Sequence, residues 1–438
     1  MTVTPTRTPT GPRRPLPDGA EALIREARRF QRRRWARRGA LLLAVVVVLV
    51  AAVAISSTQG PPPAAPRPAP FRPGPAPTAH VVGGPSLGPA TSFVLTGPTS
   101  VATDAADDAF FTDGNRLYEV DHATGQLLVV AGTGVAGFSG DGGPATAAQL
   151  DGPSDVALAP DGDVYFVDGG NRIRQVSAAT GIITDVAGTG VAGEGGDGGP
   201  AIRAPLDLSD PDGGSGGIGG QIAVGPNGDL YIADTANNVV QKISAATGTI
   251  TAVAGNGLSG ATGDGAPATK AGLCSPVGVT VDRSSDLFIA TGCDSVREVS
   301  ARTGLISTVF RTSAVPSLAG EGTVDDPVHL GLAANGDVLL AGAASRRVLE
   351  IDPATDRVLL LAGTGVQTLW VPGASAGDGG PAATATFGSV SGLAVGAGGD
   401  IYVADFFDNA IRAIDPATGL ISLVAGQIPT SPAAGHCC

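Results

Sequence analysis

The chain repeats one four-part unit six times between residues 98 and 426. The three most similar copies span residues 152–188, 219–255 and 391–426, and the looser copies begin at residues 98, 276 and 327. The residue that ends the second apolar run sets a common register with an average period of about 58: Asp113, Asp168, Asp234, Thr291, Gly342 and Asp405. Self-similar units of this length bury their surfaces against one another, so the copies must stack or close into a ring.

Each unit contains four short apolar runs that are rich in Val, Ile and Tyr, a pattern typical of β-strands. Asp161-Gly162 and Asn227-Gly228 separate the first pair of runs as hairpin turns, and an Ala-Thr-Gly turn separates the last pair. No stretch within the repeats has a helical period. Six four-stranded units therefore predict an all-β, six-bladed β-propeller over residues 80–430.

The repeat resembles a known family in its motifs. The pattern P-x-G-I/V-x-V-x-x-x-G-D-I/L-Y-I/V-A-D-x-x-N is similar to the NHL repeat, and the joining segment AGTGVAGFSGDGGPATAAQL (131–150) is similar to those of bacterial NHL proteins and the teneurin NHL propeller. The resemblance covers about residues 98–426, and Thr291 and Gly342 depart from it where the family has Asp. It implies a propeller whose loop-lined faces bind proteins, peptides or glycans.

The segment before the first copy, residues 79–98, is similar to a strand with a joining loop but has no blade of its own. It either pairs as an outer strand that closes the ring, or it is a decayed repeat. The sequence leaves both alternatives open.

The N-terminal region predicts a membrane anchor. Residues 40–55 form an unbroken apolar run, and residues 1–38 carry eleven Arg against three acidic residues. Because positive charge stays on the cytoplasmic side, we expect a cytoplasmic tail (1–38), a transmembrane signal anchor (39–57), a Pro-rich linker (58–79), an extracytoplasmic propeller and a C-terminal tail (431–438). The alternative is a signal peptide cleaved at Ala52-Val53-Ala54.

The rest of the chain is acidic, because residues 39–438 carry 37 acidic and 16 basic residues. Nucleic acid needs positive charge on its partner, so it is not expected to bind. The expected partners are the cell membrane, through residues 39–57, and an extracytoplasmic protein, peptide or glycan.

The register predicts a site on the propeller axis. The residues thirteen positions before the register series lie at the start of the innermost strands: Ser100, Asp155, Gln221, Gly278, His329 and Gly392. We expect all six at one level, with Ser100, Asp155, Gln221 and His329 forming a ligand site at the channel mouth. The alternative is that these polar groups only hydrate the channel. They are too few to form a full metal shell, so no metal is expected.

Other polar motifs favour structural roles. The SGDGGPAT loops carry Asp141, Asp197, Asp264 and Asp378, which we interpret as turn residues, and the Asp-x-x-Asn pairs after the second strand are interpreted in the same way. Cys274 and Cys293 flank one predicted hairpin and are candidates for a disulfide in an oxidising compartment.

We expect an interaction scaffold with no cofactor and no catalytic residues. The alternative is a metal-dependent hydrolase or lyase with its site at the channel mouth. Three of the four His residues (His80, His122 and His436) fall in a linker, a turn or a tail, and only His329 begins a first strand.

Overall fold

The computed structural model describes residues 84–169, 171–209, 220–311, 327–343, 345–355, 357–366 and 377–427. The predicted cytoplasmic tail (1–38), membrane helix (39–57), linker (58–79) and C-terminal tail (431–438) lie outside these residues. Among the residues that are described, no helix has the length and apolar character needed to cross a membrane.

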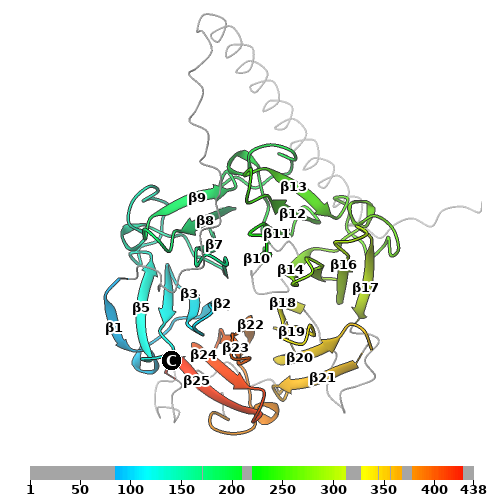
Figure 1. The fold of residues 1–438 in the computed structure, drawn as a ribbon. Coiled ribbons are helices and arrows are strands. Elements are labelled where there is room, and N and C mark those ends of the chain that lie inside the picture. The colour runs from blue at the N-terminus through cyan, green and yellow to red at the C-terminus, as the bar shows by residue number, and fades with distance from the viewer. Residues whose placement is uncertain are drawn as a thin grey trace, which may run out of the picture. The chain divides into compact units, whose positions relative to one another are not determined.

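The described chain folds into six antiparallel sheets arranged around one axis (Figure 1). Blade one holds β2 (Pro98–Thr103), β3 (Ala109–Asp113), β4 (Arg116–Val120) and β5 (Gln126–Ala131); blade two holds β6 (Asp155–Leu158), β7 (Val164–Asp168), β8 (Arg172–Val176) and β9 (Ile183–Ala187). Blade three holds β10 (Ile222–Val224), β11 (Leu230–Asp234), β12 (Val239–Ile243) and β13 (Ile250–Ala254).

The remaining blades follow the same order. Blade four holds β14 (Pro276–Val281), β15 (Leu287–Thr291), β16 (Ser295–Val299) and β17 (Ile306–Arg311). Blade five holds β18 (Pro327–Leu332), β19 (Val338–Gly342), β20 (Arg347–Asp352) and β21 (Arg357–Ala362), and blade six holds β22 (Val390–Val395), β23 (Ile401–Asp405), β24 (Ala410–Asp415) and β25 (Leu420–Gly426). The molecule is thus the six-bladed β-propeller that the repeats predict.

The hydrophobic core lies between consecutive blades. The second strand of each blade is buried along its whole length, because both of its faces pack against neighbouring sheets. Tyr165 and Ile173 of blade two, for example, share one core cluster with Leu230 and Ile232 of blade three. A single blade could not bury these two faces alone, so the fold depends on closing the ring.

The joining segments tie each blade to the next. In the segment between blades one and two, the Ala145 N–H donates to the Gly181 carbonyl at 2.8 Å, and the Gly132 N–H donates to the Ala145 carbonyl at 3.0 Å. The same pair of bonds recurs at Ala201, Ala268 and Ala382. Each buried Ala therefore joins the end of one blade to the outer edge of the blade that follows.

Residues 84–97 close the ring. The strand β1 (Ser86–Pro89) pairs with β5 on the outer edge of blade one, and the Ala90 N–H donates to the Gly125 carbonyl at 2.9 Å. From the other end of the chain, the Gln427 side chain donates to the Ser92 carbonyl at 2.6 Å. The N-terminal segment thus serves as the joining segment between blades six and one, which decides in favour of the outer-strand alternative.

Leu95 tests this closure, because it is 1% exposed in the core shared by blades one and six, whereas its neighbour Val94 is 66% exposed. Leu95→Ala should lower the free energy of unfolding by roughly 2–4 kcal/mol, since it leaves a cavity in the seam. Val94→Ala should change it by less than about 0.5 kcal/mol. Urea denaturation of both variants measures the difference, and equal values would show that the seam does not depend on this segment.

Candidate functional site

Four polar side chains from the innermost strands meet near the propeller axis. Ser100 lies on β2, Asp155 on β6 and His329 on β18, and Gln221 directly precedes β10. On the neighbouring second strand of each blade, the residues paired with them are Thr112, Val167, Ala341 and Ala233. Each of these lies one residue before the end of that second strand. The four residues therefore occupy one level, as the register predicts.

Hydrogen bonds join these side chains into one network, the axial network. Ser100 Oγ donates to Asp155 Oδ1 at 2.6 Å, and His329 Nε2 lies 3.3 Å from the same oxygen. Gln221 Nε2 lies 2.9 Å from each ring nitrogen of His329. The other oxygen of Asp155 accepts the Ile222 N–H at 2.7 Å. The network thus spans the axis from blade one to blade five.

The two glycines at this level make room for the network. A Cβ atom at Gly278 would lie 2.8 Å from Gln221 Oε1, and one at Gly392 would lie 2.6 Å from the Ser100 Cα. Side chains at these positions would collide with the network or with the backbone of blade one. At Gly392 the obstacle is backbone, so only glycine fits there, whereas at Gly278 a larger residue would displace the end of the Gln221 side chain.

The axial network is buried rather than exposed at a channel mouth. Ser100 is 0% exposed, Asp155 2%, and Gln221 and His329 5% each. Polar groups in such an environment are stable because they satisfy one another. The geometry shows a structural contribution directly, because blade four joins these bonds too: the Val279 N–H donates to Gln221 Oε1 at 2.8 Å, so five blades share the network. Ligand binding by these four residues stays a prediction.

A cavity of about 580 Å³, the mouth cavity, opens at the opposite ends of the innermost strands. Its walls are the turns after β2, β6, β10 and β14, comprising residues 103–106 and 108, 158–160 and 162, 224–226, and 281–283. From Ser100 to Thr103 the strand rises roughly 10 Å, so the mouth cavity and the axial network lie at two levels of the same inner strands.

Negative charge dominates the mouth cavity. Asp104, Asp108 and Asp282 line it, against one cation, Arg283. Asp104 and Asp282 accept backbone N–H groups of their own turns through Oδ1, so both carboxylates are held in place. Tyr402 on β23 of blade six donates to the Asp107 carbonyl in the turn after β2. Burial and then the charges of Asp107 and Asp400 raise the pKa of Tyr402 to about 12.

The Asp that ends the second strand accepts a backbone N–H from the segment that leads into its own blade. We call this bond the carboxylate clamp. The Oδ1–N distances are 2.8 Å (Asp113 to Thr96), 2.7 Å (Asp168 to Asp151), 2.8 Å (Asp234 to Asp207) and 2.9 Å (Asp405 to Gly388). The Asp of the Asp-x-x-Asn pair therefore has the structural role that the sequence analysis expects for this motif. In blade three the Asn of the pair, Asn237, donates to Asp234 at 2.9 Å.

The loop Asp residues have a role that the sequence analysis missed. Three of them pair with buried arginines on third strands: Asp141 with Arg174 at 2.8 Å, Asp264 with Arg297 at 2.6 Å and Asp378 with Arg412 at 3.1 Å. Asp197 instead accepts the Ala252 N–H, in the blade that has Gln241 at the arginine position. The signal in the sequence was an Arg six or seven residues after the register position.

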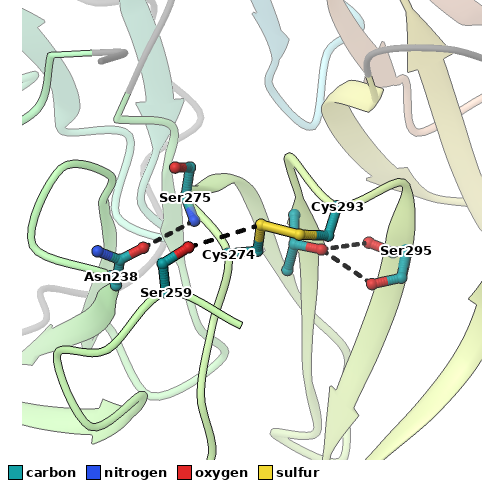
Figure 2. Close-up of a disulfide and its surroundings, with 7 residues drawn as sticks. Asn238, Ser259, Cys274, Ser275, Cys293 and Ser295 are labelled. Carbon is teal, nitrogen blue, oxygen red and sulfur yellow. Dashed lines mark hydrogen bonds between the residues drawn. A yellow bond between two sulfur atoms is a disulfide. The ribbon is translucent and has the colours of Figure 1, made fainter. Parts of the chain in front are cut away.

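The structure joins Cys274 to Cys293 in a disulfide with a Cα–Cα distance of 5.6 Å. Figure 2 shows the bond between the segment that leads into β14 and the turn after β15, with Ser259 donating to the Cys274 sulfur at 3.9 Å. In the clamps of blades one, two and six, the N–H donor lies seventeen residues before the Asp. Cys274 lies seventeen residues before Thr291, so it is the equivalent residue in blade four. The disulfide therefore links the lead-in segment to the end of the second strand in blade four, where Thr291 replaces the Asp of the carboxylate clamp.

Within the described ranges, no three His, Cys, Asp or Glu side chains are grouped so that they could hold a metal ion. The axial network brings one His and one Asp together. Ser100 donates to the same Asp155 oxygen that His329 approaches, and within the described part of the chain no hydrogen bond joins Ser100 to His329. A nucleophile activated by a neighbouring base would need that contact.

No protein-family model matches the chain. No curated protein matches it either. Its fold is similar to solved structures of virginiamycin B lyase from Staphylococcus aureus (14% identity, 78% of this chain and 89% of that chain, TM-score 0.43). It is also similar to an auxiliary nutrient binding protein from Bacteroides thetaiotaomicron (11%, 75% and 70%, 0.48) and to a gluconolactonase from Xanthomonas campestris (12%, 75% and 87%, 0.45). These likenesses concern the fold alone.

The disulfide should stabilise the propeller measurably. Its cysteines are 19 residues apart, so the double variant Cys274→Ser/Cys293→Ser should lose about 3 kcal/mol of unfolding free energy. The variant Cys437→Ser/Cys438→Ser, which changes two cysteines outside the described residues, is the control and should unfold like the wild type. Guanidinium denaturation without reductant makes the comparison. Finding both thiols free in such material would contradict the bond.

Proposed function

We propose that the protein is a membrane-anchored, extracytoplasmic interaction module of the NHL type that binds its ligand in the mouth cavity. The observation that carries the proposal is the cavity itself, because turns from four blades form its walls at the end of the axis. A concave site with a few fixed polar groups is the usual form of a binding site. The ligand belongs to the expected class of proteins, peptides and glycans.

The charge of the cavity favours a peptide or protein segment that presents a Lys or Arg side chain. Three carboxylates against one guanidinium attract a cation, and the turn hydrogen bonds hold Asp104 and Asp282 ready for it. Fixed charges of this kind lower the entropic cost of binding, because little side-chain freedom is lost.

The extracytoplasmic location rests on three features of the chain. The Arg-rich residues 1–38 precede an apolar run, which favours a cytoplasmic N-terminus. The Pro-rich residues 58–79 suit an extended spacer. The Cys274–Cys293 bond supports the same assignment, because disulfides persist mainly in oxidising compartments.

The experiment captures ligands from an envelope fraction with the full chain, identifies a bound segment and measures its affinity for variants. Asp104→Asn/Asp282→Asn keeps both turn acceptors and removes two charges, so affinity should fall at least about tenfold at low salt. Asp415→Asn, which removes one half-buried charge at the end of β24 in blade six, is the control and should bind like the wild type.

Variants of the axial network test whether the ligand binds there instead of in the mouth cavity. If His329→Ala/Asp155→Ala abolished binding in a folded protein while the Asp104→Asn/Asp282→Asn variant bound normally, the ligand would contact the axial network and the proposed cavity would be wrong. If the captured ligand were a neutral glycan that bound equally to the Asp104→Asn/Asp282→Asn and His329→Ala/Asp155→Ala variants, the inference that the acidic cavity selects a Lys or Arg side chain would be wrong.

A further inference from the structure

The turn after β23 in blade six buries two carboxyl groups beside each other. Asp405, at the end of β23, is 0% exposed, and Asp408 in the turn is 3% exposed. A side-chain hydrogen bond joins the two residues. Because an ionised carboxylate can only accept hydrogen bonds, a bond between two carboxyl groups requires a proton on one of them.

The equivalent turn of blade three shows what this position does. There Asn237 Nδ2 donates to both oxygens of Asp234, at 2.9 and 3.0 Å. Asp408 lies at the same place in blade six, three residues after the Asp of the carboxylate clamp, and in both turns the next residue has a positive φ (55° at Asn238 and 54° at Asn409). Asp408 therefore replaces a donor amide, and it can act as a donor only when it is protonated.

The outer oxygen of Asp405 has a place for that donor. Its Oδ1 accepts the Gly388 N–H at 2.9 Å, but its Oδ2 lies 3.7 Å from Arg412 Nη1, whereas the equivalent distance from Arg174 to Asp168 in blade two is 3.1 Å. Among the residues that the structure describes, no N–H group donates to Asp405 Oδ2. A hydroxyl on Asp408 would satisfy this buried acceptor.

The surrounding charges favour the proton as well. Charged groups on the elements packed against the turn are Asp378 in the joining segment, Arg412 on β24, Arg346 in the turn after β19 and Asp113 on β3. Arg412 already donates to Asp378 through Nε at 3.1 Å, and Arg346 donates to the Gly388 carbonyl at 2.8 Å. Burial, and then the charge of Asp408, raises the pKa of Asp405 well above its usual value.

The turn lies at the seam where the ring closes. A Cβ atom at Gly97 would lie 3.0–3.4 Å from carbon atoms of the Phe406 ring, so this ring packs directly on the segment 84–97 that joins blade six to blade one. A Cβ atom at Gly388 would lie 2.7 Å from Asp408 Oδ2, so Asp408 also packs against the lead-in backbone of blade six. Repulsion within the turn would therefore act on both sides of the seam.

We propose that Asp405 and Asp408 share one proton at neutral pH, and that this proton stabilises the turn that packs on the ring-closing segment, so that the closed ring loses stability as the pH rises. The proton is taken from solvent on folding and returns to it on ionisation. The shared proton does in blade six what the Asn237 amide does in blade three.

The sign and range of the effect follow from linkage. In the unfolded chain both carboxyl groups are ionised above about pH 5, so the folded pair binds one proton more. Its stabilisation is complete below the ordinary pKa of Asp and is lost as the pH rises through the raised pKa. Asp234, whose partner is an amide, has a pKa raised to about 6 by burial. A loss of stability above pH 6 therefore reports the second carboxyl group.

The test is urea denaturation of the full chain at several pH values between about 6 and 8. Over this range the unfolding equilibrium constant of the wild type should rise at least about tenfold relative to that of Asp408→Asn, because the variant supplies an amide donor that needs no proton. Infrared spectra at pH 7 should show the carbonyl stretch of one protonated carboxyl group more in the wild type than in the variant.

Asn237→Asp is the reciprocal variant, because it builds the same pair in blade three and should add a second pH dependence of the same sign. Asp151→Asn, which removes an exposed carboxyl group, is the matched control and should keep the wild-type dependence. Parallel pH profiles of the wild type and Asp408→Asn, or an unchanged profile in Asn237→Asp, would overturn the proposal.

Discussion

The carboxylate clamp is the interaction on which the rest of the propeller depends. In four blades an Asp at the end of the second strand accepts the backbone N–H of the lead-in segment at 2.7–2.9 Å. This bond fixes where the innermost strand begins. In blades one, two and three that strand then carries a residue of the axial network near one end and leads into a wall of the mouth cavity at the other. Charge-assisted bonds of this kind are stronger than neutral ones, so a single side chain can position a whole strand.

The groups that connect the lead-in segment to the end of the second strand, and the residues around them, differ between blades. Blade two compensates Asp168 with Arg174, whereas blade three has Gln241 at the arginine position, and there burial raises the pKa of Asp234 to about 6. Blade four replaces the carboxylate with a disulfide and leaves Arg297 short of acceptors. Near-identical backbones can therefore carry different local charges, which is how a repeat fold acquires distinct sites on equivalent strands.

The fold could be predicted from the sequence because the repeats are local patterns: turn residues and alternating apolar runs define each blade, and the period counts the blades. The level of Ser100, Asp155, Gln221 and His329 also followed from register. Their burial did not, because it depends on how closely the blades approach, which Gly278 and Gly392 permit. The pairing of loop carboxylates with third-strand arginines was missed, since these partners are about 33 residues apart and meet only when the joining segment folds onto its blade.

The most direct test of this account is the unfolding free energy of Asp168→Ala beside that of Asp151→Ala. The first variant removes the clamp and leaves Arg174 buried with fewer acceptors, so it should cost at least about 3 kcal/mol. The second removes an exposed carboxylate but keeps the Asp151 N–H that Asp168 binds, so it should cost less than about 0.5 kcal/mol. Similar small losses in both variants would contradict the claim that the clamp positions the inner strands.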